Sequence, residues 1–112
     1  MSTRLIALDG GPDISLDRTP MLVGRHPRCD TRINSIGVSR RHCCLAEADG
    51  EIVVNDLGST NGIQINGRRV ESGRLRPGDV LCIANLRYRV GESRIPPGSG
   101  DPDNPQVVLS ST

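Results

Sequence analysis

Short apolar runs with turn-forming pairs between them limit the folds open to this chain of 112 residues. Leu86, Tyr88 and Val90 are separated from one another by single arginines, and this period of two is typical of a half-buried strand. Asp49-Gly50 and Asn66-Gly67 have the composition of tight hairpin turns. The spacing of apolar runs and turns predicts an antiparallel β-sandwich or barrel.

The same pattern, followed along the chain, predicts strands and no helix. Apolar residues are mostly Leu, Ile and Val, and Tyr88 is the only aromatic residue, so the core is expected to be aliphatic. The predicted strands cover residues 4–9, 13–16, 21–24, 31–33, 42–47, 52–54, 63–65, 80–83 and 86–90.

The length suits one domain, and residues 1–91 are predicted to form it. After Val90 the composition changes to prolines at positions 96, 97, 102 and 105 among Gly, Ser and Asp. Such a stretch cannot bury enough apolar surface to offset the entropy lost on ordering. Residues 92–112 are therefore predicted to be a flexible tail or linker.

The sequence shows neither a secretory signal nor a membrane-spanning segment. Residues 1–9 lack the apolar block and cleavage site of a secretory signal. No apolar run approaches the length that spans a bilayer. The sequence therefore predicts a cytoplasmic protein without a membrane partner.

All fourteen basic residues are arginine. The absence of lysine excludes enzymes that need a P-loop, kinase or Schiff-base lysine. Arginine is the better bidentate ligand for phosphate. The net charge of +1 predicts no broad electrostatic attraction to nucleic acid or membrane.

The four cysteines do not have the spacing of a metal site. Cys43 and Cys44 are adjacent and point to opposite faces of a predicted strand, so they cannot hold one zinc ion together. We expect reduced structural thiols at Cys29, Cys43, Cys44 and Cys82, and neither a metal nor a cofactor.

Three short stretches beside predicted strands combine arginines, hydroxyls and turn-forming glycines. They are Gly24-Arg25, Ser-Arg-Arg-His at residues 39–42, and Gly-Ser-Thr-Asn-Gly at residues 58–62. An arginine fork, a hydroxyl and backbone amides exposed in turns supply charge-assisted hydrogen bonds to a phosphate dianion without proton transfer. The three stretches predict one anion-binding rim and favour recognition over catalysis.

These motifs, in this order and followed by Asn66-Gly67 and a Pro-Gly-Asp turn at residues 77–79, closely resemble the forkhead-associated (FHA) domain family. The similarity covers about residues 4–90. It implies an eleven-stranded antiparallel β-sandwich, related to Smad-type effector domains, whose loops at one end bind phosphothreonine peptides.

The resemblance also implies roles for individual residues. Arg25 is the expected principal phosphate ligand, and Ser39 is expected to donate its hydroxyl to a phosphate oxygen, with the amide or side chain of Arg40 beside it. Thr60 is expected to help bind the phosphate. Asn61 is expected to hydrogen-bond the peptide backbone next to the phosphoresidue.

A second group of residues is expected to support the binding loops. Gly24 is expected to let the backbone enter its loop without a Cβ clash, and Gly62 is expected to supply a positive φ angle. Asn66-Gly67 is expected to support the Thr-Asn-Gly loop of residues 60–62 from behind. Ser39 and His42 could suggest a nucleophile and a base, but side chains three residues apart on an extended segment project to opposite sides. The resemblance instead implies that His42 is a buried scaffold residue.

The sequence departs from the family pattern at two positions. Gly37 stands where some members carry a basic residue, which leaves the preference for residues around the phosphothreonine open; Arg28, Arg32 and Arg41 are candidates to compensate. Ala84 replaces the glycine that usually follows the isoleucine after the Pro-Gly-Asp turn.

The predicted function is therefore that of a module, not an enzyme, which reads phosphothreonine on a protein partner in Ser/Thr kinase signalling. The expected partner is a Ser/Thr protein kinase or its substrate. A phosphate-independent interaction or oligomerisation module, using another face or a sheet edge, is the alternative. Binding of single-stranded nucleic acid is disfavoured, because base stacking needs aromatic platforms and only Tyr88 is present.

Overall fold

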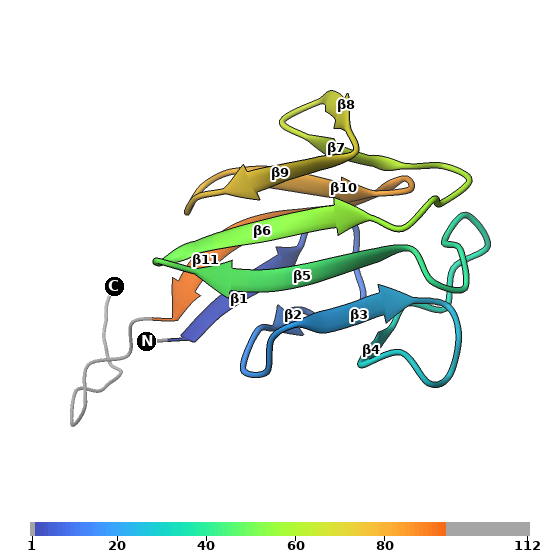
Figure 1. Cartoon of the computed structure of the whole chain (residues 1–112), viewed down its shortest axis with the longest axis horizontal. Helices are drawn as coiled ribbons and strands as arrows, with labels where there is room; N and C mark the ends of the chain where they lie inside the picture. The colour runs from blue at the N-terminus through green and yellow to red at the C-terminus, as the bar shows by residue number, and fades with distance from the viewer. Residues whose placement is uncertain (1, 94–112) are drawn as a thin grey trace.

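Eleven strands form two sheets that pack face to face (Figure 1). This computed structural model describes residues 2–93. The strands are β1 (Ser2–Ala7), β2 (Ile14–Ser15), β3 (Met21–Gly24), β4 (Thr31–Arg32), β5 (Cys43–Ala48), β6 (Glu51–Asp56), β7 (Ile63–Ile65), β8 (Arg68–Val70), β9 (Ser72–Leu75), β10 (Val80–Ile83) and β11 (Leu86–Ser93). The predicted all-β, eleven-stranded sandwich is confirmed.

The two sheets differ in size. One has six strands in the order β2-β1-β11-β10-β7-β8, and the other has five in the order β4-β3-β5-β6-β9. Most neighbouring strands are antiparallel. Both predicted hairpins are confirmed: Asp49-Gly50 joins β5 to β6 and Asn66-Gly67 joins β7 to β8, and all four residues have positive φ, as a type I′ turn requires.

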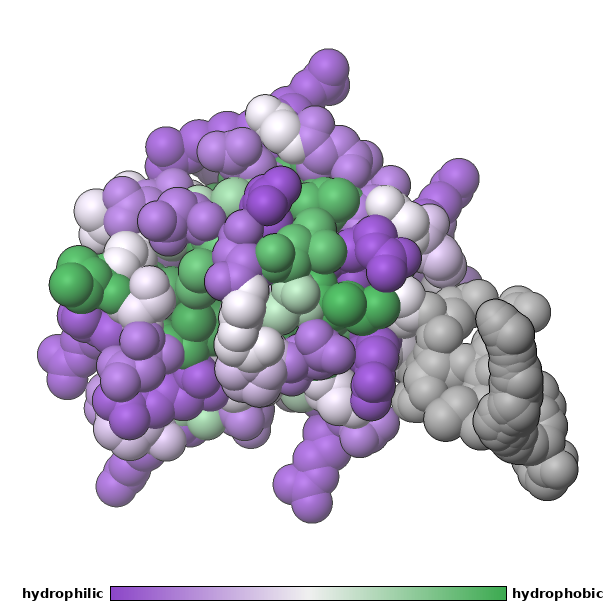
Figure 2. Space-filling model, turned by 180° about the vertical axis from the view of Figure 1, so that it is seen from behind, coloured by the Kyte–Doolittle hydropathy of each residue, from purple (hydrophilic) through white to green (hydrophobic). Residues whose placement is uncertain are grey.

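The core lies between the sheets and follows the predicted alternation. On β11 Tyr88 and Val90 are buried, whereas Arg87 and Arg89 are exposed. Leu45 of β5 is fully buried opposite them, in the same apolar cluster. As expected from the composition, this core is almost wholly aliphatic. The outer surface seen from behind in Figure 2 is largely hydrophilic, with hydrophobic residues among the polar ones.

Two strands, β8 and β9, escaped the sequence prediction. Each lies at the edge of its sheet and is mostly exposed. Edge strands are commonly short and charged, which protects them from pairing with other chains. A strand of this kind has no clear apolar alternation in its own sequence. It can be recognised only from its hydrogen bonds to the neighbouring strand.

One pairing corrects the prediction of a wholly antiparallel sandwich. β4 runs parallel to β3, with Val23 opposite Thr31 and Gly24 opposite Arg32. A parallel pair usually needs a connection of a dozen or more residues. Here residues 25–30 suffice because they fold back on themselves, held by a hydrogen bond from the Leu22 amide to Asp30 Oδ2 at 2.7 Å.

The turn between β10 and β11 carries backbone strain. Ala84 and Asn85 form this two-residue turn, and Ala84 has a φ of 57°. A positive φ at only the first turn residue is the pattern of a type II′ turn, in which glycine is favoured at that position. The alanine that departs from the family pattern therefore sits where a Cβ is unfavourable.

Substituting Ala84→Gly is expected to raise the free energy of unfolding by about 0.5–1 kcal/mol, because relief of the positive φ outweighs the extra entropy that glycine has in the unfolded chain. Chemical denaturation of both proteins measures the difference. Ala46→Gly, inside β5, is the matched control and is expected to destabilise. A loss of stability in both variants would show that the positive φ of Ala84 does not destabilise the protein.

The last strand ends slightly beyond the predicted end of the domain. β11 continues to Ser93, two residues beyond the predicted end of the domain at residue 91. Most of the predicted tail, from residue 94 on, lies outside the described residues. Among residues 2–93 there is no helix of the length and hydropathy needed to cross a membrane.

Candidate functional site

Three loops gather at one end of the sandwich, on the right in Figure 1, and together we call them the rim. They comprise residues 25–30, 33–42 and 57–62. The Arg25 amide donates to the Ser39 carbonyl at 2.9 Å, and the His26 amide donates to the Arg40 carbonyl at 3.1 Å. The structure thus brings together the three stretches that the sequence singled out.

Gly24 is required by this close approach of the first two loops. A Cβ on Gly24 would lie 2.2 Å from the Arg40 carbonyl oxygen and 3.0 Å from that of Ser39. Both contacts are with backbone, which cannot rotate away as a side chain can. The segment that carries Ser39 and Arg40 can pass over β3 at this point only because Gly24 has no side chain.

His42 joins the second loop to the third and is fully buried. The Ser39 amide donates to His42 Nδ1 at 3.0 Å, and His42 Nε2 lies 2.8 Å from the Gly62 carbonyl oxygen. A carbonyl only accepts, so Nε2 carries the proton and Nδ1 is the acceptor. The ring therefore satisfies two backbone groups that are far apart in the sequence.

This arrangement leaves His42 without a nitrogen that could act as a base. Nδ1 accepts from the Ser39 amide, and Nε2 carries the proton that it donates to the Gly62 carbonyl. A serine nucleophile would need a free acceptor nitrogen within hydrogen-bond reach of its hydroxyl. Ser39 and His42 therefore do not have the geometry of a hydrolytic dyad. The His42 ring instead acts as a clamp between the backbones of the second and third loops.

The Ser39 hydroxyl is oriented by the third loop. The Thr60 amide donates to Ser39 Oγ at 3.0 Å. Since the oxygen accepts this bond, the hydroxyl hydrogen remains available to donate elsewhere. Ser39 and Thr60 thus present neighbouring hydroxyl groups from two different loops.

Asn61 is held in a similar way. Its Nδ2 donates to the Gly37 carbonyl at 2.7 Å. The carbonyl can only accept, which identifies the nitrogen and leaves Asn61 Oδ1 to face away as an acceptor. Asn61 is exposed, so this oxygen is open to a ligand.

The turn of the third loop depends on Gly62, whose φ is 77°. Its amide donates to Ser59 Oγ at 2.9 Å, and the Ser59 amide donates to Asp56 Oδ1 at 3.2 Å. A Cβ on Gly62 would also lie 2.6 Å from Arg69 Nε. Both the backbone angle and the neighbouring arginine therefore favour glycine.

A hollow of about 400 Å³ lies at the rim, between the three loops. All five residues predicted to bind the phosphopeptide line it, and no acidic residue does. Ile36, which is 92% exposed, was missed by the sequence prediction; an isoleucine in a polar loop was the only signal. The complete lining is Arg25, Ile36, Gly37, Val38, Ser39, Arg40, Thr60 and Asn61.

Two predicted support residues, Asn66 and Gly67, lie away from this hollow. They are at the other end of β7 from Gly62. Asn66 Nδ2 donates to Asp79 Oδ1 at 3.1 Å, and Asn66 Oδ1 accepts from the Val80 amide at 2.9 Å. The Arg76 amide and the Asn66 side chain hold the pKa of Asp79 below its usual value. The contacts of Asn66 thus brace the turn before β10.

The cysteines show no feature of a reactive or metal site within residues 2–93. All four are free, and no group of three His, Cys, Asp or Glu side chains is close enough to hold a metal ion there. Burial raises the pKa of Cys43 to about 12, so it is a neutral thiol. Cys29 Sγ donates to the Arg40 carbonyl at 3.2 Å and so helps to hold the rim.

Comparison with known proteins identifies relatives of this fold. Residues 21–84 match the family described as FHA domain. The chain is 34% identical over 102 residues to the proliferation marker protein Ki-67 of Mus musculus, covering 90% of this chain and 3% of Ki-67. It is 36% identical over 87 residues to the glycogen accumulation regulator GarA of Mycolicibacterium smegmatis, covering 74% of this chain and 55% of GarA. The chain thus spans about half of GarA and a small part of Ki-67.

The fold agrees with the sequence match. An FHA domain solved in a structural and functional analysis of phosphothreonine-dependent FHA domain interactions superposes with a TM-score of 0.76 at 29% identity. The superposition covers 85% of this chain and all of that one.

Proposed function

Because the chain belongs to the FHA domain family, we propose that it binds phosphothreonine on a protein partner in Ser/Thr kinase signalling. One observation carries the proposal: Arg25, Ser39 and Thr60, which have a guanidinium and two hydroxyls, line one hollow together, and no acidic residue lines it. A doubly charged phosphate is the ligand that such donors suit best.

The phosphate would be held by donors from all three loops. The Arg25 guanidinium supplies paired N–H groups, and the Ser39 hydroxyl has a hydrogen left to donate. The Arg40 amide has no hydrogen-bond partner within residues 2–93, so it is a further donor at the same hollow. Thr60 contributes its hydroxyl, since its amide is already bound to Ser39.

The peptide around the phosphothreonine would be held by Asn61. The free Oδ1 of Asn61 accepts a backbone N–H of an extended ligand, while its Nδ2 stays fixed to the Gly37 carbonyl. A side chain that is already immobilised loses little entropy on binding. This supports recognition of the peptide backbone beside the phosphoresidue.

The proposed module performs no chemistry on its partner. Both nitrogens of the buried His42 are engaged by backbone groups, so Ser39 has no base to accept its proton. Binding is therefore reversible capture, and the partner is a Ser/Thr kinase or a substrate that such a kinase has phosphorylated.

The four free cysteines suit a cytoplasmic location, where thiols are kept reduced.

The test is fluorescence anisotropy with a degenerate phosphothreonine peptide library and its unphosphorylated twin at one salt concentration. Since hydrogen bonds to charged groups contribute about 1.5–3 kcal/mol each, we expect the phosphorylated library to bind at least about 100-fold more tightly. A phosphoserine library tests the preference for threonine that the family implies. Equal binding of the phosphorylated and unphosphorylated libraries would favour a phosphate-independent interaction module instead.

A further inference from the structure

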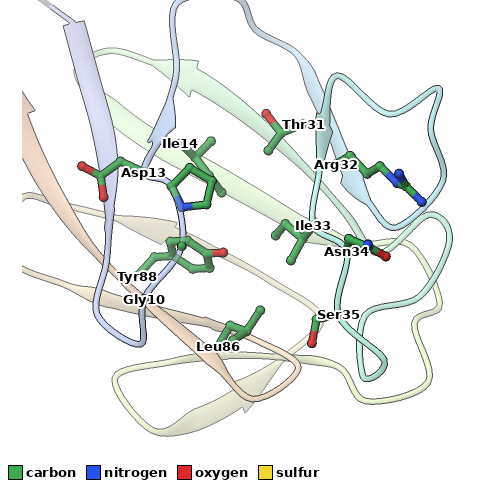
Figure 3. A pocket seen from close by; sticks show the side chains of 12 residues that line it. Gly10, Asp13, Ile14, Thr31, Arg32, Ile33, Asn34, Ser35, Leu86 and Tyr88 are labelled. Carbon is green, nitrogen blue, oxygen red and sulfur yellow. The ribbon is translucent and has the colours of Figure 1, made fainter.

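A second hollow, of about 360 Å³, lies behind the start of the second rim loop (Figure 3). It opens between the β1–β2 connection, residues 31–35 and the start of β11. The side chains of Ile14, Ile33, Leu86 and Tyr88 face its centre in Figure 3. These walls are mainly apolar, unlike those of the hollow at the rim.

The Tyr88 hydroxyl is the polar feature of this second hollow. Tyr88 is 95% buried, since only 5% of its surface is exposed, and its hydroxyl points into the space (Figure 3). Within residues 2–93 the hydroxyl has no hydrogen-bond partner in the protein. A hydroxyl that bonds to no protein group offers a ligand in the hollow an additional hydrogen bond. Burial raises the pKa of Tyr88, so the group is a neutral phenol that can both donate and accept.

One segment of the rim separates the second hollow from the hollow at the rim. Ile33, Asn34 and Ser35 line the second hollow, and the next five residues line the hollow at the rim. The segment is fixed at both ends: the Ile33 amide donates to the Gly24 carbonyl at 2.8 Å, and the Val38 amide donates to the Ser35 carbonyl at 3.0 Å. The two hollows therefore lie next to one another along one short, fixed segment.

We propose that the second hollow binds an aromatic side chain of the same partner whose phosphothreonine occupies the rim. The proposal rests on the proposed function, because a partner can reach the second hollow in this way only when its phosphothreonine is bound at the rim. The segment that lines both hollows places them close enough for one partner to occupy both. A cavity of roughly 150 Å³ holds benzene, so this larger space has room for a tryptophan or tyrosine. Both side chains combine an apolar ring with a hydrogen-bonding group that can meet the Tyr88 hydroxyl.

The test uses phosphothreonine peptides that carry one tryptophan at increasing Gly/Ser spacings on either side of the phosphoresidue, each paired with an alanine twin. At a spacing that reaches the hollow, tethering is expected to make the tryptophan peptide bind about tenfold or more tightly than its twin. Leu86→Trp, which fills the hollow, is expected to remove that gain, and Tyr88→Phe is expected to reduce it. Leu8→Trp, at an exposed leucine that lies outside the rim and lines neither hollow, is the matched control and is expected to keep it.

Two outcomes overturn the proposal: no gain at any spacing, or a gain that persists in Leu86→Trp. The alanine peptides report on the rim alone, and their unchanged affinity for Leu86→Trp would show that this variant is folded. Free indole, titrated against protein with labelled methyl groups, gives a readout that does not depend on phosphate. Shifts at the Ile14, Ile33 and Leu86 methyl groups are expected, and their absence overturns the aromatic site whether or not the phosphopeptide binds.

Discussion

Replacing Arg25 with alanine is expected to weaken binding of a phosphothreonine peptide by about 2–5 kcal/mol, which is roughly a 30- to 4000-fold increase in Kd. The physical reason is the loss of one member of a desolvated charge pair. Arg25 is half-buried in the hollow at the rim, and no acidic side chain lines that hollow to share its charge. The phosphate would lose its principal cation, and the remaining donors are mostly neutral.

The effect should isolate the side chain, because the backbone of Arg25 is held independently. Its amide donates to the Ser39 carbonyl, and its carbonyl accepts from Arg32 Nε at 2.8 Å. Neither bond uses the guanidinium of Arg25, so the loop keeps its shape in Arg25→Ala. Arg25→Lys retains the charge without the fork and is expected to bind with intermediate affinity.

Arg28→Ala is the matched control, because Arg28 belongs to the same loop, is exposed and does not line the hollow. It removes the same charge from the rim, and a change of less than about 1 kcal/mol is expected, as for other exposed charges. Fluorescence anisotropy at one salt concentration measures all three variants. Equal losses in Arg25→Ala and Arg28→Ala would mean that general electrostatic attraction, and not a built phosphate site, holds the peptide.

Replacing His42 with alanine is expected to lower the free energy of unfolding by about 2–5 kcal/mol, since two buried backbone groups each lose a partner. These are the Ser39 amide and the Gly62 carbonyl, which the imidazole bonds from opposite sides. The cavity left by the ring adds to the loss. Because Ser39 and Thr60 depend on the clamp for their positions, phosphopeptide binding should also weaken below the unfolding temperature.

His26→Ala is the control for this prediction. His26 is only half-buried, and its Nδ1 accepts one bond, from the Arg28 amide at 3.0 Å within the same loop. A loss of about 1 kcal/mol or less is expected there. Urea denaturation of both variants, with peptide binding measured on the folded proteins, distinguishes the two histidines. If His42→Ala were as stable as the native protein, the hydrogen bonds of the His42 ring would not contribute to the free energy of unfolding.

Much of the fold could be predicted, because hairpins are specified by nearby residues. β3, β7 and β10 have the predicted bounds, and Asp49-Gly50 and Asn66-Gly67 form the predicted hairpin turns. The rim was also predictable, because its three motifs lie beside predicted strands and share the same phosphate-binding groups. Less predictable were β8 and β9, whose pairing depends on strands elsewhere in the chain and whose exposed residues have no periodic pattern.

Residue types and their short spacings are enough to predict the alternation of buried and exposed residues, the tight turns and the inventory of phosphate donors. Which atoms of those donors remain free depends on contacts between distant segments. The tautomer of His42, the hydrogen left on Ser39 and the open oxygen of Asn61 are each set by a backbone group at least three residues away, and mostly twenty or more. Long-range contacts likewise left the Tyr88 hydroxyl unpartnered within the described chain. Hydrogen-bond capacity is a property of the residue, but its use depends on which distant segments packing brings within 3 Å or so.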